Sequence, residues 1–217
     1  MSYLSHRSVL LALIVCGLSA GAWAQSSAAS STASPSDVQH SEFSAQVSGV
    51  FTRSTENNPT DHVAANSAGL LLGYRYHFNG WEAVEVEYGY TRNGQSYFTP
   101  ATAAGAPAAN NFVTADMHQL IANEVITTPR LFHFFQPFIL AGGGAVMFRP
   151  RSGPGVSNQT RGAFNYGAGV DFHIDHLGAR LEYQGLIFKV PDFNNPILRV
   201  NKWTHVAQPS IGLVFTF

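Results

Sequence analysis

The sequence is poor in charge and nearly without cysteine. Asp, Glu, Lys and Arg make up 12% of its 217 residues, about half the share found in an ordinary soluble domain. The single cysteine, Cys16, lies in the N-terminal leader described below, so the remaining chain has no disulfide and no thiol chemistry. Lys and Arg total 12 against 13 Asp and Glu, and this balance argues against nucleic acid as a partner.

Long apolar runs and metal-binding spacings are missing too. After the leader, no apolar stretch approaches the ~20 residues that a membrane-spanning helix needs. The nine histidines show neither an HxH nor an HExxH spacing, so the sequence predicts no metal site, and it predicts no cofactor. Aromatic residues are plentiful by contrast, with 16 Phe, 8 Tyr and 3 Trp.

The N-terminus predicts export. A short basic start precedes an apolar run, and alanines stand three and one positions before a cleavage site at Gln25. This pattern is typical of a secretory signal peptide over residues 1–24. A membrane anchor would need a longer apolar run, and Val15 before Cys16 does not fit a lipoprotein site. An exported, aromatic-rich chain of low charge is expected to be a secreted all-β protein or an outer-membrane barrel.

Alternating hydrophobicity fills most of the chain after the leader. The Ser- and Ala-rich stretch 25–40 is predicted to be a flexible tether, and residues 41–217 suit one domain. Within that domain, eight segments alternate between apolar and polar or small residues, as strands with two different faces do. The segments are 43–52, 68–78, 81–92, 113–127, 136–148, 163–174, 178–188 and a final strand ending at Phe217.

Connections between these segments alternate in length. Long ones are expected at 53–67, 93–112, 149–162 and 189–203, and short ones at 79–80, 128–135 and 175–177. The first short connection is Asn-Gly, a strong hairpin signal. Outer-membrane barrels have an even number of strands, short periplasmic turns and long outer loops. The sequence therefore predicts an all-β fold, an eight-stranded antiparallel up-and-down transmembrane β-barrel.

The facing of the strands separates this barrel from a soluble one. Lipocalin-type barrels turn apolar residues inward around a ligand. Here one phase carries aromatic residues and the other carries glycine and charge, which fits a lipid-facing exterior with aromatic girdles. Both phases of 113–127 contain polar residues, and we expect Leu120, Ala122 and Ile126 to face outward. A soluble ligand carrier is the alternative.

Charged residues on the inward phase are expected to pair. Eight strands enclose an interior that side chains fill, and an unpaired buried charge is costly. Arg75 can pair with Glu85 or Glu87 across neighbouring strands, and Arg180 with Asp171. The alternative to such a plug is an ion-conducting or gating path. The predicted lumen salt-bridge network consists of Arg75, Glu85, Glu87, Asp171, Arg180 and Glu182.

No catalytic residue is predicted. Glu85 and Glu87 have the spacing of an acid–base pair, but no nucleophile or oxyanion donor accompanies them. Ser210 and His205 are five residues apart on one strand, which places them on opposite faces. The chain is therefore expected not to be an enzyme.

Cations gather in or beside the long connections, where they outnumber the acids. Arg and Lys pair well with the phosphates of lipopolysaccharide, so we expect a rim that faces this lipid. Ordinary solvated loop charge is the alternative. The candidate rim residues are Arg149, Arg151, Arg161, Lys189, Arg199 and Lys202.

Several stretches resemble the OmpA-type eight-stranded outer-membrane β-barrels, in particular the barrel-only members of the porin family. They are EVEYGYTRN (85–93), QPFILAGGGAVMFRP (136–150), FNYGAGVDFHI (164–174), ARLEYQGLIFKVPDF (179–193) and the final GLVFTF. The resemblance implies residence in the outer membrane of a Gram-negative-type bacterium, with a structural or surface-interaction role through four extracellular loops. A small pore and a lipid-A-modifying enzyme are the alternatives. It also implies that Phe217, Phe215 and Leu213 form the signal that the barrel-assembly machinery binds.

Overall fold

The computed structural model describes residues 40–54, 61–99, 101, 108–129, 131, 134–153, 155–198 and 200–217. The chain divides into two units, Met1–Val38 and Gln39–Phe217, and the account below concerns the second. The predicted signal peptide, Cys16, the tether up to residue 39 and Arg199 lie outside the described residues. No helix in the described ranges is long and apolar enough to cross a bilayer.

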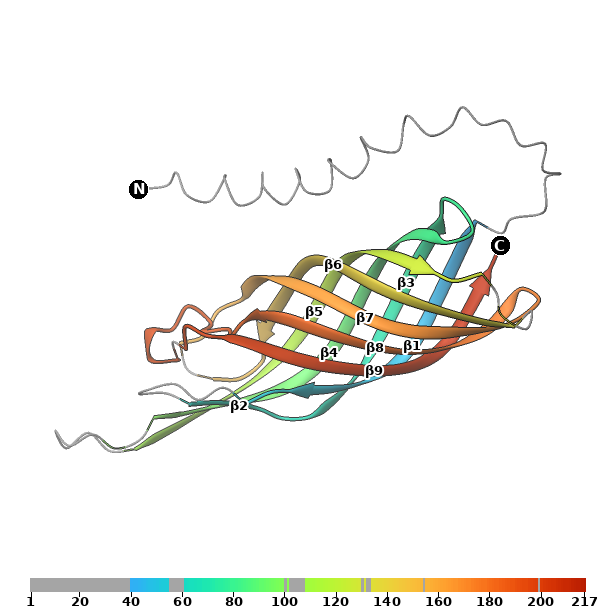
Figure 1. Ribbon diagram of the computed structural model, residues 1–217. Coiled ribbons are helices and arrows are strands. Elements are labelled where there is room, and N and C mark those ends of the chain that lie inside the picture. The colour runs from blue at the N-terminus through green and yellow to red at the C-terminus, as the bar shows by residue number, and fades with distance from the viewer. Residues whose placement is uncertain are drawn as a thin grey trace, which may run out of the picture. The chain divides into compact units, whose positions relative to one another are not determined.

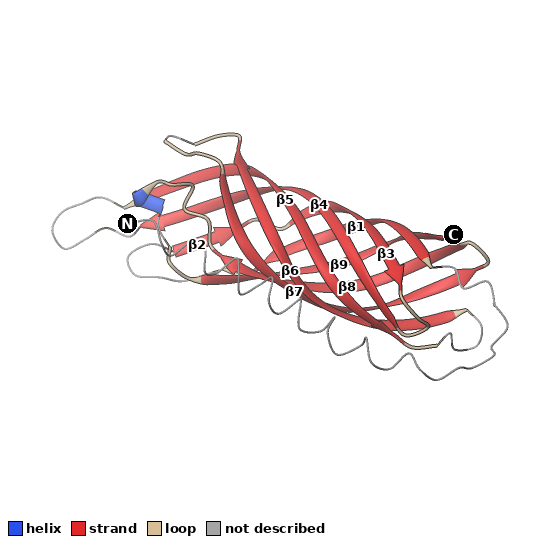
Figure 2. Ribbon diagram, turned by 90° about the horizontal axis from the view of Figure 1, so that it is seen from above, coloured by secondary structure: helices blue, strands red, loops and turns tan. Residues whose placement is uncertain are grey.

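Antiparallel strands make up most of the described chain (Figures 1 and 2). They are β1 (Ser41–Thr52), β2 (Asp61–Ala64), β3 (Ser67–His77), β4 (Glu82–Thr99), β5 (Ala109–Thr127), β6 (Phe135–Pro150), β7 (Gln159–Ile174), β8 (Leu177–Lys189) and β9 (Trp203–Thr216), with one short 3-10 helix, η1 (Pro196–Leu198). Pairing runs from β1 through β3, β4, β5, β6, β7, β8 and β9 back to β1. Eight strands therefore close a barrel, which confirms the predicted fold class, while β2 pairs with the far end of β4 and lengthens the wall.

Closure depends on the ladder between β1 and β9. The register runs from Glu42 opposite Thr216 to Thr52 opposite Val206. At its end, Ser41 N donates to the Phe217 carbonyl at 3.2 Å, and Phe217 N donates to the Ser41 carbonyl at 2.9 Å. Both backbone partners of Phe217 are thereby satisfied, which a barrel edge in lipid requires.

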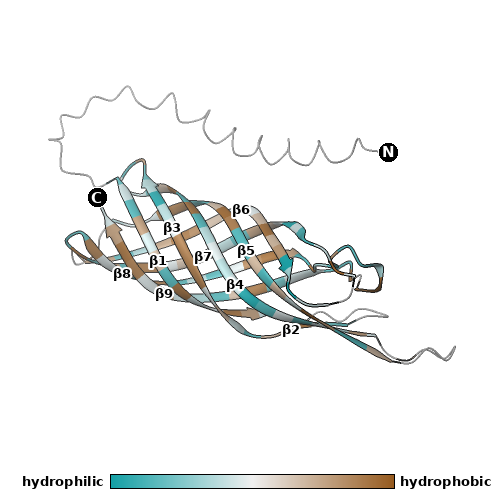
Figure 3. Ribbon diagram, turned by 180° about the vertical axis from the view of Figure 1, so that it is seen from behind, coloured by the Kyte–Doolittle hydropathy of each residue, from teal (hydrophilic) through white to brown (hydrophobic). Residues whose placement is uncertain are grey.

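The two faces of the wall have opposite polarity (Figure 3). On β3, Leu70, Leu72 and Tyr74 point outward and are 44–55% exposed, whereas Leu71 and Arg75 point inward and are 1% exposed. The same alternation holds on β5, where Leu120, Ala122 and Ile126 are exposed on the outer face as predicted. Apolar side chains thus line the outside of a barrel whose lumen contains charge.

Some strands are longer than the sequence predicted. β4 and β5 continue past the expected ends at 92 and 113 and pair as far as Thr99 opposite Ala109. β2 lies within the expected connection 53–67. The Gly-, Asn- and Ser-rich composition of 93–98 is typical of a loop, but the pairing partner supplies backbone hydrogen bonds that composition alone does not reveal.

The interior contains two layers. Polar and charged side chains occupy the half near the short turns, and a cluster of buried apolar side chains, here called the apolar cluster, occupies the half near the long connections. The connection between β8 and β9 folds over this second layer and contributes Val190, Phe193, Leu198 and Val200. The remaining members of the apolar cluster are Val50, Tyr97, Val113, Ala115, Met117, Ile121, Val146, Phe148, Leu186, Phe188 and Val206.

Candidate functional site: the sealed lumen and the outer rim

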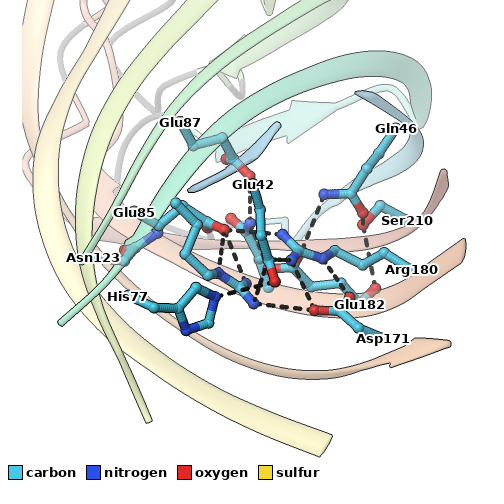
Figure 4. A network of polar contacts seen from close by, with 12 residues as sticks. Glu42, Gln46, His77, Glu85, Glu87, Asn123, Asp171, Arg180, Glu182 and Ser210 are labelled. Atoms are coloured by element: carbon cyan, nitrogen blue, oxygen red, sulfur yellow. Dashed lines mark hydrogen bonds and ion pairs between the residues drawn. The ribbon is translucent and has the colours of Figure 1, made fainter. Parts of the chain in front are cut away.

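The lumen is crossed by an ionic cluster of two guanidiniums and three carboxylates (Figure 4). Arg180 lies 2.6 Å from Asp171, 2.9 Å from Glu85 and 3.1 Å from Glu42. Arg75 contacts the same three carboxylates, at 3.1 Å, 2.9 Å and 3.7 Å respectively. Each cation therefore contacts every one of the three anions, and both guanidiniums are only 1% exposed.

Strand register and barrel closure together build this cluster. Arg75 lies opposite Glu85 and Glu42 on the two neighbouring strands, and Arg180 lies opposite Asp171. These cross-strand neighbours follow from register alone. The contacts of Arg75 with Asp171 and of Arg180 with Glu85 join strands that are not neighbours, so they exist because the sheet closes.

One aromatic ring supports both cations. The guanidinium carbon of Arg75 lies 4.2 Å from the centre of the Phe138 ring, and that of Arg180 lies 5.0 Å from it. Phe138 is buried on the inward face of β6. A cation over an aromatic face gains electrostatic stabilisation that increases when the pair is desolvated, as it is here.

The remaining two predicted lumen residues, Glu87 and Glu182, are held by amides. Gln184 Nε2 donates to Glu87 Oε2 at 2.6 Å and to Glu182 Oε1 at 2.9 Å. Gln119 Nε2 donates to Glu87 Oε1 and Gln46 Nε2 to Glu182 Oε2, both at 3.1 Å. The six predicted residues thus form two groups: four lie in the ionic cluster, and the carboxylate pair Glu87 and Glu182 lies beside it.

Sequence reasoning missed two members of the ionic cluster, Glu42 and His77. Glu42 stands one residue before the predicted start of the first strand, so its inward phase was not counted. His77 is on the inward phase of the second predicted strand, and its Nε2 lies 3.0 Å from Glu42 Oε1. Extending the first alternation by a single residue would have identified Glu42.

A polar clamp holds the β8–β9 connection over the lumen. Gln159 Nε2 donates to Asp192, while its Oε1 accepts from the backbone N of Asp192 and of Phe193 at 2.9 Å and 3.1 Å. Tyr97 donates its hydroxyl to the Pro191 carbonyl at 2.6 Å. The loop is thereby fixed with Phe193 buried in the apolar cluster.

Charge also holds Asp192 in the clamp. Burial raises the pKa of its carboxyl, but hydrogen bonds from Gln159 and the Asn194 amide, together with the nearby charge of Arg161, bring the pKa below its usual range. Arg161 Nη2 lies 3.2 Å from Asp192.

The rim cations take different positions. Arg149, Arg151, Lys189 and Lys202 are exposed near the long connections. Arg161 occupies an inward-facing position of β7 and is half-buried at the barrel mouth, so it is not presented to surrounding lipid. Lys189 lies beside Trp203, with its Nζ 5.7 Å from the ring.

One carboxylate organises part of this rim on the outer wall. Asp116 contacts Arg92 at 2.7 Å and also Arg151, and it accepts a hydrogen bond from the Tyr90 hydroxyl at 3.3 Å. Arg149 is the register partner of Asp116 on β6. Three cations therefore surround one anion, which leaves an excess of positive charge at this place.

The residues considered for catalysis do not assemble. Ser210 points inward and donates to Gln46 Oε1 at 3.0 Å. His205 is on the other face, where its Nε2 lies 3.0 Å from the Tyr166 hydroxyl. Glu85 is engaged by two arginines, and Glu87 by two glutamines. Ser210 and His205 therefore form no dyad, and Glu85 and Glu87 have no matched acid–base arrangement.

The three residues of the predicted assembly signal lie on the lipid-facing side of β9 and its end. Leu213, Phe215 and Phe217 are 60%, 50% and 57% exposed. The rings of Phe215 and Phe217 lie 5.9 Å apart. These side chains contribute little to packing within the barrel and are available to lipid or to a partner.

Comparison with known proteins agrees with this architecture. The sequence profile described as outer membrane protein beta-barrel domain matches residues 8–215. The solved structure of Neisserial surface protein A (NspA) superposes with a TM-score of 0.54 at 14% identity, covering 82% of this chain and 97% of that chain. The outer membrane protein OprG from Pseudomonas aeruginosa gives 0.53 at 14% identity, covering 82% and 95%. No curated protein matches the chain. At such identities the structural likeness concerns the fold alone.

Proposed function

Because the chain belongs to the family of outer membrane protein beta-barrel domains, we propose that it is a sealed barrel with a structural or surface-interaction role in the outer membrane. The observation that carries this proposal is the double filling of the lumen. The ionic cluster blocks the half near the short turns, and the apolar cluster beneath the β8–β9 connection blocks the other half.

Ions would have to cross both layers to pass. In the first layer, water or an ion must displace guanidinium–carboxylate contacts that are buried and mutually satisfied. In the second layer, an ion would lose its hydration among side chains such as Phe148, Phe188 and Phe193, which are at most 3% exposed. A filled lumen of this kind favours a scaffold for the outer surface over the alternative of a small pore.

A planar-bilayer recording tests the sealed state. The purified barrel is inserted into a lipid bilayer, and assembly is verified by the heat-dependent gel mobility of the same preparation. We expect no unitary conductance steps from the wild-type barrel. Gln159→Ala serves as the comparison, because it removes the clamp on Asp192 and Phe193 and should increase the frequency of brief openings. Stable channel steps from the wild type would favour the pore.

Lipopolysaccharide is the partner that the outer rim favours. Arg149, Arg151 and Lys189 are exposed on the outward face of the wall, and guanidinium groups bind phosphate in a bidentate manner. The proposed test measures lipopolysaccharide binding to nanodisc-embedded barrel after all three are replaced by alanine. Arg161→Ala is the matched control, because that side chain pairs with Asp192 at the barrel mouth. Equal affinity of the triple variant and the control would contradict this role.

Assembly by the barrel-assembly machinery is proposed for the terminal aromatic strand. Phe217 is exposed on the outer face and hydrogen-bonds β1 through its backbone, not its side chain. Phe217→Ala should therefore refold in detergent like the wild type but accumulate poorly in outer membranes of expressing cells. Equal accumulation of both proteins would argue against a signal role for this side chain.

We also propose that the chain is not an enzyme. The alternative activity is modification of lipid A, and mass spectrometry of lipid A from cells with and without the protein addresses it. An unchanged spectrum is expected. A new acyl or headgroup modification that depends on expression would refute the proposal.

A further inference from the structure

The buried polar layer contains more negative than positive charge. Two guanidiniums, Arg75 and Arg180, face five carboxylates that are each at most 5% exposed. With His77 protonated against Glu42, three positive charges would still face five negative ones among these strand residues. Buried charge without compensation is too costly to persist. The five carboxylates belong to Glu42, Glu85, Glu87, Asp171 and Glu182.

The uncompensated charge is located at the carboxylate pair. The described contacts of Glu87 and Glu182 are amide hydrogen bonds, which satisfy oxygen atoms but do not neutralise charge. The neighbouring ionic cluster does not supply the missing charge, since its two guanidiniums already face three carboxylates. One oxygen each from Glu85, Glu87 and Glu182 lie within 4.8 Å of one another. Atoms spaced in this way can all reach one ion at the calcium–oxygen distance of about 2.3–2.6 Å.

Unpartnered buried oxygens point to a ligand independently of the acidic cluster. Within the described chain, Gln184 Oε1 has no hydrogen-bond partner, although Gln184 is 0% exposed. Its amide lies between Glu87 and Glu182, because its Nε2 contacts both. Glu85 Oε1 likewise has no hydrogen-bond partner among the described residues, whereas Oε2 accepts from both arginines. An oxygen that can only accept is satisfied by a donor or by a cation.

We propose that Glu85, Glu87, Glu182 and Gln184 bind one calcium-sized divalent cation. The donor set consists of oxygen atoms, which hard cations prefer over nitrogen and sulfur ligands. Both oxygens of Glu87 and of Glu182, with Oε1 of Glu85 and of Gln184, supply six ligands, and calcium takes 6–8. Magnesium keeps several of its waters, for which a site this buried has less room.

The cation would balance the lumen and join opposite walls. Two positive charges added to Arg75, Arg180 and protonated His77 equal the five carboxylates. Glu85 and Glu87 belong to β4, whereas Glu182 and Gln184 belong to β8. Three strands separate β4 from β8 in either direction around the eight-stranded barrel. A shared ion at this place therefore cross-links the barrel through its lumen.

The experiment compares barrels refolded in lipopolysaccharide-free detergent with calcium chloride, magnesium chloride or a chelator. After gel filtration, elemental analysis measures the metal that each chain retains, and gel mobility measures the midpoint of heat unfolding. We expect about one calcium per chain and a midpoint at least about 5 °C above the chelator sample. Magnesium should produce a smaller shift.

Conservative variants separate this site from surface binding. Glu87→Gln and Glu182→Gln should fold, retain no calcium and lose the calcium-dependent shift, because each amide keeps the shape and removes one buried charge. Glu124→Gln is the matched control, since Glu124 is exposed on the outer wall, and it should keep the full response. Unchanged calcium retention in the Glu87→Gln barrel would overturn the proposal. If neither lumen variant assembles, a wild-type barrel that retains no calcium and shows equal midpoints overturns it as well.

Discussion

Replacing Arg180 by methionine tests whether the ionic cluster stabilises the barrel. Arg180 binds Asp171 through two parallel hydrogen bonds of 2.6 Å and 2.8 Å, from Nε and Nη2. It also donates to Glu85 at 2.9 Å and to Glu42 at 3.1 Å. Methionine is also long and unbranched, but it leaves these carboxylates with Arg75 as their only guanidinium partner in the cluster.

The expected loss is about 3–5 kcal/mol in the free energy of unfolding, the usual cost of removing one partner from a buried ion pair. Arg75 still contacts all three carboxylates, which keeps the loss within that range although three contacts disappear. Arg92→Met is the control. Its guanidinium also pairs with a carboxylate, Asp116 at 2.7 Å, but is 58% exposed, so its removal should cost less than about 1 kcal/mol.

Urea unfolding of the refolded barrels in detergent, followed by tryptophan fluorescence and gel mobility, measures both losses. A double variant, Arg180→Met with Asp171→Asn, should recover part of the loss, because it also removes one of the carboxylates left in excess. The reasoning fails if Arg180→Met costs no more than Arg92→Met. It also fails if the double variant is as unstable as the sum of its two single variants.

Three further predictions concern the lid and the wall. Phe193→Ala should lower the free energy of unfolding by about 3–5 kcal/mol, since it leaves a cavity in the apolar cluster; urea unfolding measures it, and a loss below about 1 kcal/mol would contradict the packing. The lowered pKa of Asp192 means that its carboxylate contributes stability above the unfolded value of about 3.9, and that this contribution disappears as the pH falls below it. Urea midpoints between pH 6 and pH 2 should therefore fall less steeply for Asp192→Asn than for the wild type, and parallel curves would count against the clamp by Gln159. Gly144→Ala should impair refolding, because its Cβ would meet the backbone of β5, whereas Gly162→Ala, with open space around it, should refold normally in the same gel-mobility assay.

Strand facing was predictable because it depends on local sequence. Each residue's neighbours at i+2 share its face, and lipid outside with side chains inside gives those faces opposite composition. Even β5, whose two phases both contain polar residues, was assigned correctly from Leu120, Ala122 and Ile126. Strand ends were less predictable, because the Gly- and Asn-rich stretch 93–98 becomes strand only when β2 and β5 pair with it.

Cross-strand neighbours in the lumen were partly predictable, but partners across it were not. The pairs Arg75–Glu85 and Arg180–Asp171 lie in direct register. The sequence gave no reason to expect Glu87 and Glu182 beside amide groups and away from the arginines. That arrangement depends on which residues of β4 and β8 reach the same height, and the tilt of the strands in the closed barrel sets this height.

The apolar seal shows the same division. Residues 189–203 carry no alternation and were predicted to be a long outer connection, yet Val190, Phe193, Leu198 and Val200 are buried in the lumen. Local sequence therefore determined which residues form strands and which side of the wall meets lipid, since both follow from period-two spacing. Only the tertiary structure decided which charges meet and how the outer mouth is closed, because side chains far apart in sequence come together once the first and last strands pair.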